Sequence, residues 1–305
     1  MNVGAANFGS GPLTVSGTAI GQQTVGGPGS SAPTSAAGPL HGTARRVDAV
    51  DVGVLTVLDV ESQAVRSVLS AQHDYRIHRP LDDGPQVHEA VIDANGHPLR
   101  IAAAQTLDRG PRSAALAHQA LVRTCAPRVV LLVGIAGGIN DAVGIGDVVV
   151  ADEVIYYDAR RVDEQGTLRR GQSHTIAAPL GHRLNEFFVD SGNTLTWHGA
   201  QFRVRRGPIG SGDAVVTAEH ASIRQWLRTF NEKVLAVETE AAGVVQAFHE
   251  ARGQDIAPHG WIVVRGISDT ADRHKGHSDH RLASEHAAAV MLRLLPHLRF
   301  APPPG

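Results

Sequence analysis

Acidic side chains follow three of the predicted strands in this sequence, at the point where each strand ends. Glu61 comes just after one apolar run, Glu240 after a second and Asp269 after a third. In open α/β sheets, ligands bind at the C-terminal ends of strands, so chemistry is expected at these positions. Carboxyl groups there can donate or accept protons. Each of them alone could instead cap the helix that follows, but three together exceed what a solvated surface requires.

The elements that would carry these carboxylates alternate between apolar strands and amphipathic helices from Arg45 onward. This alternation is typical of an α/β fold. Asn95-Gly96 lies between two short apolar segments and predicts a hairpin turn, and Gly134 to Gly138 predict a turn at which the backbone approaches a ligand closely. Buried strands are predicted at 50–58, 128–133, 147–155, 204–209, 234–237 and 261–267, and helices at 60–68, 112–124 and 278–295.

The first 44 residues differ sharply from the rest of the chain. They hold no Asp, Glu, Lys or Arg and are rich in Gly, Ser, Ala and Pro. This composition is typical of a flexible tail and linker, with an uncharged assembly segment as the alternative. We therefore divide the chain into a tail over 1–44 and an α/β domain over 45–300.

Composition and charge exclude several classes of function. The 305 residues carry 28 basic and 30 acidic side chains, a formal charge of −2, and this balance offers no field for nucleic acid or a membrane surface. The sequence has neither an apolar run long enough to span a bilayer nor a signal-peptide pattern, so we expect a cytoplasmic protein. The single cysteine, Cys125, excludes a disulfide framework and a multi-cysteine zinc site.

Five motifs follow one another in the order and spacing of a known family. They are VGVLTVLDVES at 52–62, LLVGIAGGINDAVGIGDVVVADEVIYYDA at 131–159, GPIGSGDAVVT at 207–217, LAVETEAAGVVQAFH at 235–249 and VVRGISDTAD at 263–272. Together they resemble the nucleoside phosphorylase superfamily and, within it, the methylthioadenosine/S-adenosylhomocysteine nucleosidases, over about residues 48–297. The resemblance implies a single three-layer α/β domain with a central mixed, mostly parallel sheet, preceded by the flexible Gly/Ser-rich tail.

The resemblance also implies roles for residues within these motifs. Asp269 would protonate or hydrogen-bond N7 of a purine, and Ser268 would position this carboxyl group. Glu240 would hold the ribose hydroxyls, and Glu61, helped by Arg265, would activate the attacking water. The other substrate-binding residues that the resemblance implies, around the base and along the same pocket, are Thr239, Val215, Val216, Ala136 and Gly137.

These roles fit the electrostatics of breaking a ribose–base bond. Cleavage builds positive charge on the sugar and negative charge on the base, so an acid beside the base and a carboxylate beside the sugar are the matching groups. The reaction needs no cofactor and no metal. We expect a purine N-ribosyl hydrolase, with adenine as the base, whose partner is a small-molecule purine nucleoside or nucleotide and which forms a homo-oligomer, a dimer or higher.

The nucleophile decides between hydrolysis and phosphorolysis. Phosphorylases of this superfamily carry arginines after the first strand and beside the glycine-rich turn, but this sequence has Leu58 to Glu61 and Leu132 there. An anionic Glu61 would repel phosphate at close range, which favours water as the nucleophile. The alternatives are a phosphate-dependent purine nucleoside phosphorylase and a non-catalytic purine-binding sensor, although a sensor would not need both an acid and a water-activating base.

The segment expected to shape the pocket for the 5′ end of the substrate departs most from the nucleosidases. Its arginines and those of the preceding loop are Arg160, Arg161, Arg169, Arg170, Arg109 and Arg112. Guanidinium groups suit phosphate oxygens, which predicts a 5′-phosphorylated adenine nucleotide as substrate; a general bias toward arginine is the alternative. By analogy with relatives paired with bacterial antiviral systems, such an enzyme would act as a defence effector.

Histidines crowd the segment that follows Asp269. They are His274, His277, His280 and His286. Their spacing could hold a metal ion, but the predicted reaction requires none. We therefore expect this segment to form a polar lid over the pocket.

Overall fold

Runs of β-branched and aliphatic residues build the central strands of this protein, whose structure is a computed structural model. It describes residues 49–79, 84–164, 166–214, 216, 221–253, 257–270 and 277–299. These residues belong to one compact unit, Thr43–Gly305. The predicted tail over 1–44 lies outside the described residues.

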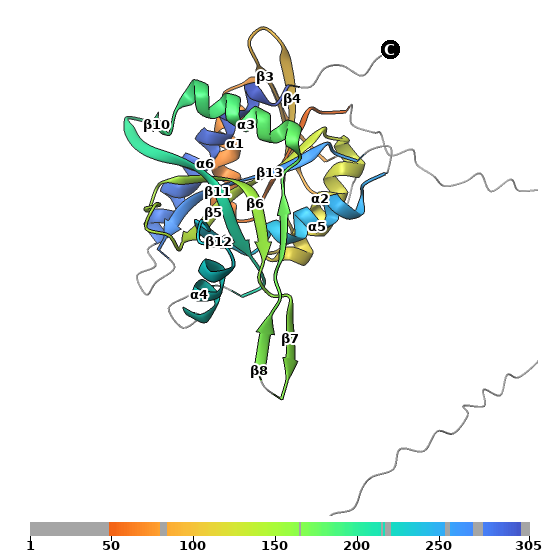
Figure 1. Ribbon diagram of the computed structural model, residues 1–305. Coiled ribbons are helices and arrows are strands. Elements are labelled where there is room, and N and C mark those ends of the chain that lie inside the picture. The colour runs from red at the N-terminus through yellow and green to blue at the C-terminus, as the bar shows by residue number, and fades with distance from the viewer. Residues whose placement is uncertain are drawn as a thin grey trace, which may run out of the picture. The chain divides into compact units, whose positions relative to one another are not determined.

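The strands form one large sheet and one small sheet (Figure 1). The large sheet has the order β10-β11-β6-β13-β5-β1-β4-β3-β2, with β12 bonded to β11 and β5, and β9 bonded to β6. The strands are β1 (Val52–Thr56), β2 (His73–His78), β3 (Val87–Asp93), β4 (Pro98–Gln105), β5 (Val129–Gly138), β6 (Val148–Tyr156), β7 (Arg160–Asp163), β8 (Gly166–Arg169), β9 (Gln172–Thr175), β10 (Thr194–Trp197), β11 (Ala200–Ser211), β12 (Ala236–Glu238) and β13 (Gly260–Asp269).

Helices lie between these strands in the chain. They are α1 (Asp59–Ser70), α2 (Pro111–Cys125), α3 (Ala178–Ser191), α4 (Ala221–Phe230), α5 (Ala241–Glu250) and α6 (His277–Leu294), and a 3-10 turn, η2 (Leu295–His297), follows α6. Within the ranges that the structure describes, no helix combines the length and the apolar character needed to cross a membrane.

Alternation along the central strands puts helices on both faces of the sheet. On β5, Val129, Leu131 and Val133 pack with residues of α1, α3 and α6, whereas Val130 and Leu132 pack with residues of α2 and α5. This arrangement confirms the predicted three-layer α/β fold.

Parallel pairing gathers the functional strand ends at one edge. Strands β4, β1, β5 and β13 are parallel neighbours, so their C-terminal ends lie together. The sheet is mixed, as predicted, because β6 runs antiparallel to β13 and β2 and β3 continue the far side in antiparallel fashion. The predicted hairpin at Asn95-Gly96 joins β3 to β4, and both turn residues have positive φ, 56° and 81°.

One predicted turn is wrong. The glycine-rich stretch from Gly134 to Gly138 continues β5 and pairs with β13 and β12. Its glycines leave room for side chains of neighbouring elements, so the strand passes through without bending away. The site therefore receives the backbone of a strand here instead of a loop.

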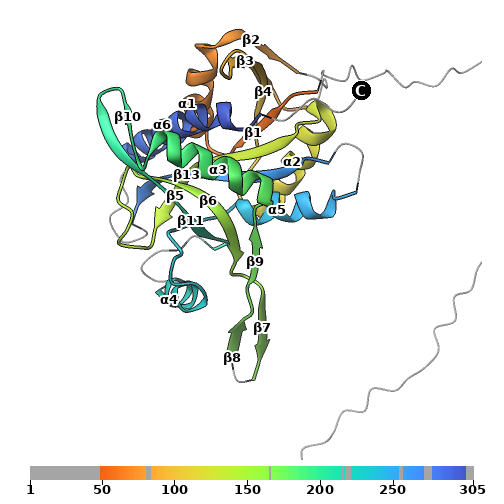
Figure 2. The same ribbon diagram turned by 45° about the horizontal axis from the view of Figure 1, so that its top comes forward.

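Strands β7 and β8 form a hairpin that projects from the body in both ribbon views (Figures 1 and 2). All four side chains of β7 are exposed. The apolar residues Val162 and Leu168 are 70% and 56% exposed. Neither strand was expected from the sequence, because this stretch lacks the apolar alternation of a strand that packs on a core.

Candidate active site

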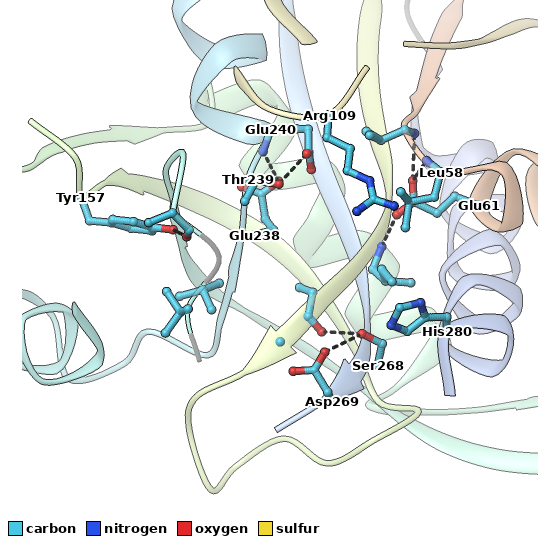
Figure 3. Close-up of a pocket in the computed structure, with 17 residues that line it drawn as sticks. Leu58, Glu61, Arg109, Tyr157, Glu238, Thr239, Glu240, Ser268, Asp269 and His280 are labelled. Atoms are coloured by element: carbon cyan, nitrogen blue, oxygen red, sulfur yellow. Dashed lines mark hydrogen bonds between the residues drawn. The ribbon is translucent and has the colours of Figure 1, made fainter. Parts of the chain in front are cut away.

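A pocket opens at the edge of the sheet where the parallel strands end (Figure 3). Strand β13 supplies an aspartate at its end, β5 supplies main-chain atoms, and the segments after β1 and β12 supply the other carboxylates. The predicted site residues that line it are Glu61, Ala136, Gly137, Val216, Thr239, Glu240, Ser268 and Asp269. The structure thus brings together residues that lie up to about two hundred positions apart in the sequence.

Glu61 is held at the start of α1 by backbone N–H groups. Its Oε2 accepts hydrogen bonds from the N–H of Val57 and of Leu58, each at 2.8 Å, and its Oε1 accepts one from Ile135 at 2.8 Å. A carboxylate oxygen can accept two hydrogen bonds, so Oε1 retains the capacity for one more. Burial raises the pKa of Glu61 above its ordinary value, against the opposing effects of Arg265 and these three N–H groups.

Arg265 lies behind the pocket wall and joins three carboxylates. It is fully buried on β13, and its guanidinium contacts Glu238, Glu240 at 3.2 Å and Glu61 at 3.8 Å. Burial lowers its pKa, but the three carboxylates together outweigh burial, and the pKa is raised. Arg265, predicted as the helper of Glu61, is not among the lining residues, and its contacts join carboxylates that are.

Glu238 fixes this arginine to the start of α5. Its carboxylate accepts hydrogen bonds from the N–H of Glu240 at 3.1 Å and of Ala241 at 2.9 Å, and it forms the closest ion pair of Arg265. Burial raises the pKa of Glu238, and the neighbouring Glu240 adds to the rise. The sequence placed this residue beside the site without assigning it a role.

Glu240 connects α5 to the loop that precedes α2. Its Oε1 accepts hydrogen bonds from the Gly110 N–H at 3.0 Å and from the Thr239 hydroxyl at 2.5 Å. Gly110 has φ +92°, a conformation that favours glycine. This backbone conformation directs the Gly110 N–H toward the Glu240 carboxylate. Thr239 therefore positions Glu240 in addition to lining the pocket.

Ser268 and Asp269 end β13 at the opposite side of the pocket (Figure 3). The Ser268 hydroxyl lies 3.2 Å from Asp269 Oδ2 and 3.4 Å from the carbonyl oxygen of Ala136. Both residues are buried. The serine hydroxyl therefore lies within hydrogen-bond distance of the aspartate that it is predicted to position.

An apolar wall completes the pocket beside Asp269. Tyr157 is fully buried and packs in one cluster with Val216, Ile139 and Val237. Its hydroxyl donates a hydrogen bond to the carbonyl of Ala214 at 2.7 Å, and burial raises its pKa. A flat aromatic base would find its face contacts here. Val215, the other predicted base-flanking residue, lies outside the described residues.

The structure does not bring Arg160 and Arg161 to the pocket. Both lie on the projecting hairpin, and Arg161 pairs with Asp163 at 2.7 Å. Strand pairing between β7 and β8 carries both residues outward, and neither is among the residues that line the pocket. Among the arginines that the structure describes, Arg109 lines the pocket.

The histidines after Asp269 do not form one group. His280, at the start of α6, lines the pocket beside Ser268 (Figure 3). His286 instead packs on Phe202 and lies 2.6 Å from the carbonyl oxygen of Gly146. His274 and the side chain of His277 lie outside the described residues. Among the described residues, no group of three or more His, Cys, Asp or Glu side chains is arranged to hold a metal ion.

Other residues also line the pocket, and the sequence predicts two of them near it, Arg109 among the arginines at the 5′ end and His280 in the polar lid. These other residues are Val57, Leu58, Arg109, Ile135, Tyr157, Ala214, Val237, Glu238 and His280. Most are apolar residues next to a predicted strand end, where neighbours of the assigned carboxylates could have been included. Arg109, one of the arginines expected near the 5′ end of the substrate, follows β4 across a short loop.

Gly134 allows the carboxylate cluster to approach the sheet. A Cβ at this position would overlap Arg265 Nη1 and Glu61 Oε1, so we expect Gly134→Ala to lower the free energy of unfolding by about 1–3 kcal/mol, the usual range for overpacking. Chemical denaturation measures this. Gly144→Ala is the control, because the nearest atom to its new Cβ lies at 3.6 Å. Equal stability of the two variants would contradict the packing described here.

Comparisons with known proteins agree with this architecture. The model of the phosphorylase superfamily matches residues 72–298. A solved structure of futalosine hydrolase from Helicobacter pylori superposes with a TM-score of 0.61 at 19% identity, covering 80% of this chain and 97% of that one. At this identity the superposition establishes the shared fold.

Two curated relatives are named as nucleosidases. ATP nucleosidase Cap17 from Escherichia coli (strain KTE188) is 26% identical over 262 residues, which cover 80% of this chain and 50% of the relative, so the chain spans about half the length of that protein. The 5′-methylthioadenosine/S-adenosylhomocysteine nucleosidase of Mycobacterium bovis (strain ATCC BAA-935 / AF2122/97) is 27% identical over 270 residues, covering 81% of this chain and 98% of the relative.

The family match covers most of the chain and includes the segments after β12 and β13, where Glu240 and Asp269 enter the pocket. With the three-layer fold and the strand-end pocket in agreement, this chain belongs to the phosphorylase superfamily.

Proposed function

We propose that the protein hydrolyses the N-glycosidic bond of an adenine nucleoside or 5′-nucleotide and releases the free base. The observation that carries the proposal is the pocket itself, which has Asp269 at one end and Glu61 and Glu240 at the other. Cleavage separates charge between base and sugar, and this arrangement offers a suitable group at each end. The names of the two curated relatives support the same reaction class.

On the base side, Asp269 would donate its proton to N7 of the purine as the bond from C1′ to the base breaks. The electron pair of that bond moves to the base, and protonation makes the base a better leaving group. Ser268 would orient the carboxyl group, which it contacts at 3.2 Å. The wall formed by Tyr157 and Val216 would hold the face of the base.

On the sugar side, Glu240 would accept hydrogen bonds from the ribose 2′- and 3′-hydroxyls. Glu61 would accept a proton from water, through the remaining acceptor position of Oε1, as the water oxygen attacks C1′. Arg265 keeps both carboxylates in place from behind the pocket. The products are free base and a ribose or its 5′-derivative.

Phosphorolysis is the second candidate, and one observation favours it. Arg109 lines the pocket and would attract an anion. Glu61 argues against it, because a buried carboxylate beside the attacking position repels phosphate more strongly than an exposed one would. The two reactions differ in their nucleophile and hence in their sugar product.

The nucleophile can be identified directly. We expect base release at the same rate with and without inorganic phosphate, and incorporation of ¹⁸O from labelled water into the ribose product. The reason is that Glu61 accepts a proton from water but repels phosphate. Mass spectrometry of the sugar measures the label. Strict phosphate dependence with ribose 1-phosphate as product would replace the hydrolase by the phosphorylase.

A substrate panel separates the enzyme from a purine-binding sensor. The protein is incubated with adenosine, methylthioadenosine, S-adenosylhomocysteine, AMP and ATP, and free adenine is measured by chromatography. Release of adenine from at least one compound supports the enzyme. Binding of these compounds without any release would favour the sensor.

We also propose that the protein acts as an effector in bacterial antiviral defence and works as a homo-oligomer. Cleavage of adenine nucleotides would drain a pool that every cell requires, which suits an activity released only under attack. Leu107 is fully exposed and Leu116 is 67% exposed, and a second copy could cover them. Analytical ultracentrifugation tests the oligomer, and survival of phage-infected cells with the wild-type or the Asp269→Asn protein tests the effector role.

A further inference from the structure

A second cavity adjoins the catalytic pocket, and Arg109 lines both. The walls of this cavity come from α1, α2, β3, β4, the loop after β4, Arg79 after β2, and residues 84–86 before β3. Its described charged side chains are Arg66, Arg79, Arg109 and Arg112, with Asp108 as the acidic one. We call it the basic cavity. Cavities lined by one sign of charge concentrate ligands of the opposite sign.

The loop that carries Arg109 is fixed at several points. The Thr106 hydroxyl donates a hydrogen bond to the Asp108 carbonyl at 2.8 Å, and the Asp108 N–H donates one to the Ser113 hydroxyl at 2.9 Å. At the other end, the Gly110 N–H binds Glu240. Arg109 therefore stands directly beside the carboxylate to which we assign the ribose hydroxyls.

The direction of Arg109 defines how a nucleotide would lie. In Figure 3 its side chain points into the pocket on the side of Glu61 and Glu240, opposite the end that holds Asp269. A base placed at Asp269 and a ribose placed at Glu240 would bring the sugar next to Arg109. Arg109 also lines the basic cavity. A phosphate chain attached to the sugar beside Arg109 can therefore continue into that cavity.

The arginines that would contact the phosphate chain are not neutralised by carboxylates of the described residues. No carboxylate among the described residues forms an ion pair with Arg109 or Arg112, and the carboxylates Glu61 and Glu240 already pair with Arg265. A guanidinium without a carboxylate partner can form charge-assisted, paired hydrogen bonds with phosphate oxygens. A thioether offers no such bonds.

We propose that the basic cavity holds the phosphate chain of a nucleoside 5′-di- or triphosphate, with Arg109 at the phosphate nearest the ribose and Arg112 farther along. The proposal rests on the proposed function, because it takes the position of the ribose from Glu240. A monophosphate would reach Arg109 alone, whereas a longer chain would engage Arg112 as well. The preferred order of substrates is therefore ATP and ADP, then AMP, then adenosine or methylthioadenosine.

The ratio of specificity constants tests this order. For the wild-type protein we expect kcat/KM for ATP to exceed that for adenosine by at least tenfold, and added salt to reduce only the ATP value. Arg112→Gln and Arg109→Gln should each lower the ATP-to-adenosine ratio by about tenfold, the usual size of one lost charged hydrogen bond. Arg183→Gln, on α3 and paired with Glu186, is the control and should leave the ratio unchanged.

The outcomes separate this inference from the reaction itself. If adenine is released but the ratio is the same in wild type, Arg109→Gln and Arg112→Gln, the subsite is overturned and the hydrolase stands. If no compound is cleaved, the hydrolase falls, and equilibrium binding of ATP and adenosine by calorimetry decides the subsite alone. A tenfold loss of ATP affinity in Arg112→Gln then supports it, and unchanged affinity overturns it.

Discussion

Replacing Asp269 with Asn is expected to reduce kcat for adenine release by about 10²–10⁴-fold, the usual contribution of a general acid. The amide has nearly the same size as the carboxyl group and fits at the end of β13, where Asp269 is buried beside Ser268. It can still hydrogen-bond the base but has no proton to transfer to N7. Steady-state kinetics with the best substrate of the panel measure the loss.

The matched control for this variant is Asp163→Asn on the projecting hairpin. It removes a carboxylate that pairs with the exposed Arg161 and does not line the pocket. Unfolding curves and adenine binding should be the same for wild type and both variants. An Asp269→Asn protein that keeps more than half of the wild-type kcat would show that proton donation comes from another group.

Replacing Glu61 with Gln should have the second largest effect, a loss of about 10²-fold or more from the missing general base. A second consequence follows from its hydrogen bonds. One carboxylate oxygen of Glu61 accepts hydrogen bonds from the N–H groups of Val57 and Leu58, and the other accepts one from Ile135. Glutamine has only one acceptor oxygen, so it cannot accept hydrogen bonds on both sides. The variant should also be less stable by about 1 kcal/mol, the value of a typical helix cap.

The pH dependence separates these two consequences. Burial raises the pKa of Glu61 above the ordinary value of 4.5, and the base acts only when it is ionised. The wild-type kcat/KM should therefore fall as the pH is lowered through this raised pKa, and Glu61→Gln should lose that acidic limb in its residual activity. A variant that merely loosens the fold would keep the limb. Retention of the limb in a folded variant would exclude Glu61 as the base.

The sequence predicted the central part of the fold because its strands are buried on both faces. The apolar runs that became β1, β5, β6 and β13 leave no other placement for so many aliphatic residues. Glu61, Glu240 and Asp269 could be found because they lie at or shortly after the ends of the apolar strands β1, β12 and β13. The contacts of Arg265 could not, since they join Glu61 on α1 to Glu238 and Glu240, which lie far from it in the sequence.

The projecting hairpin shows the limit of reading strands from apolar periodicity. Strands β7 and β8 pair with one another outside the main sheet, so their side chains need not be apolar, and they hold Arg160 and Arg161 away from the residues that line the pocket. Arg109, in contrast, reaches the pocket because the Gly110–Glu240 hydrogen bond draws its loop inward. Contacts between segments far apart in sequence decided which arginines lie near the carboxylates.

Glu61 closes the first turn of α1 by accepting a hydrogen bond from the Leu58 N–H, and it is also the residue that we propose as the general base. One side chain thus belongs to both the secondary structure and the chemistry. If this end of the helix unfolded, the Glu61 carboxylate would leave the pocket. Molecules in which the start of α1 is locally unfolded should therefore be inactive. The same constraint applies to substitutions at the proposed catalytic position, because a replacement must also accept the hydrogen bonds that Glu61 accepts at the start of α1.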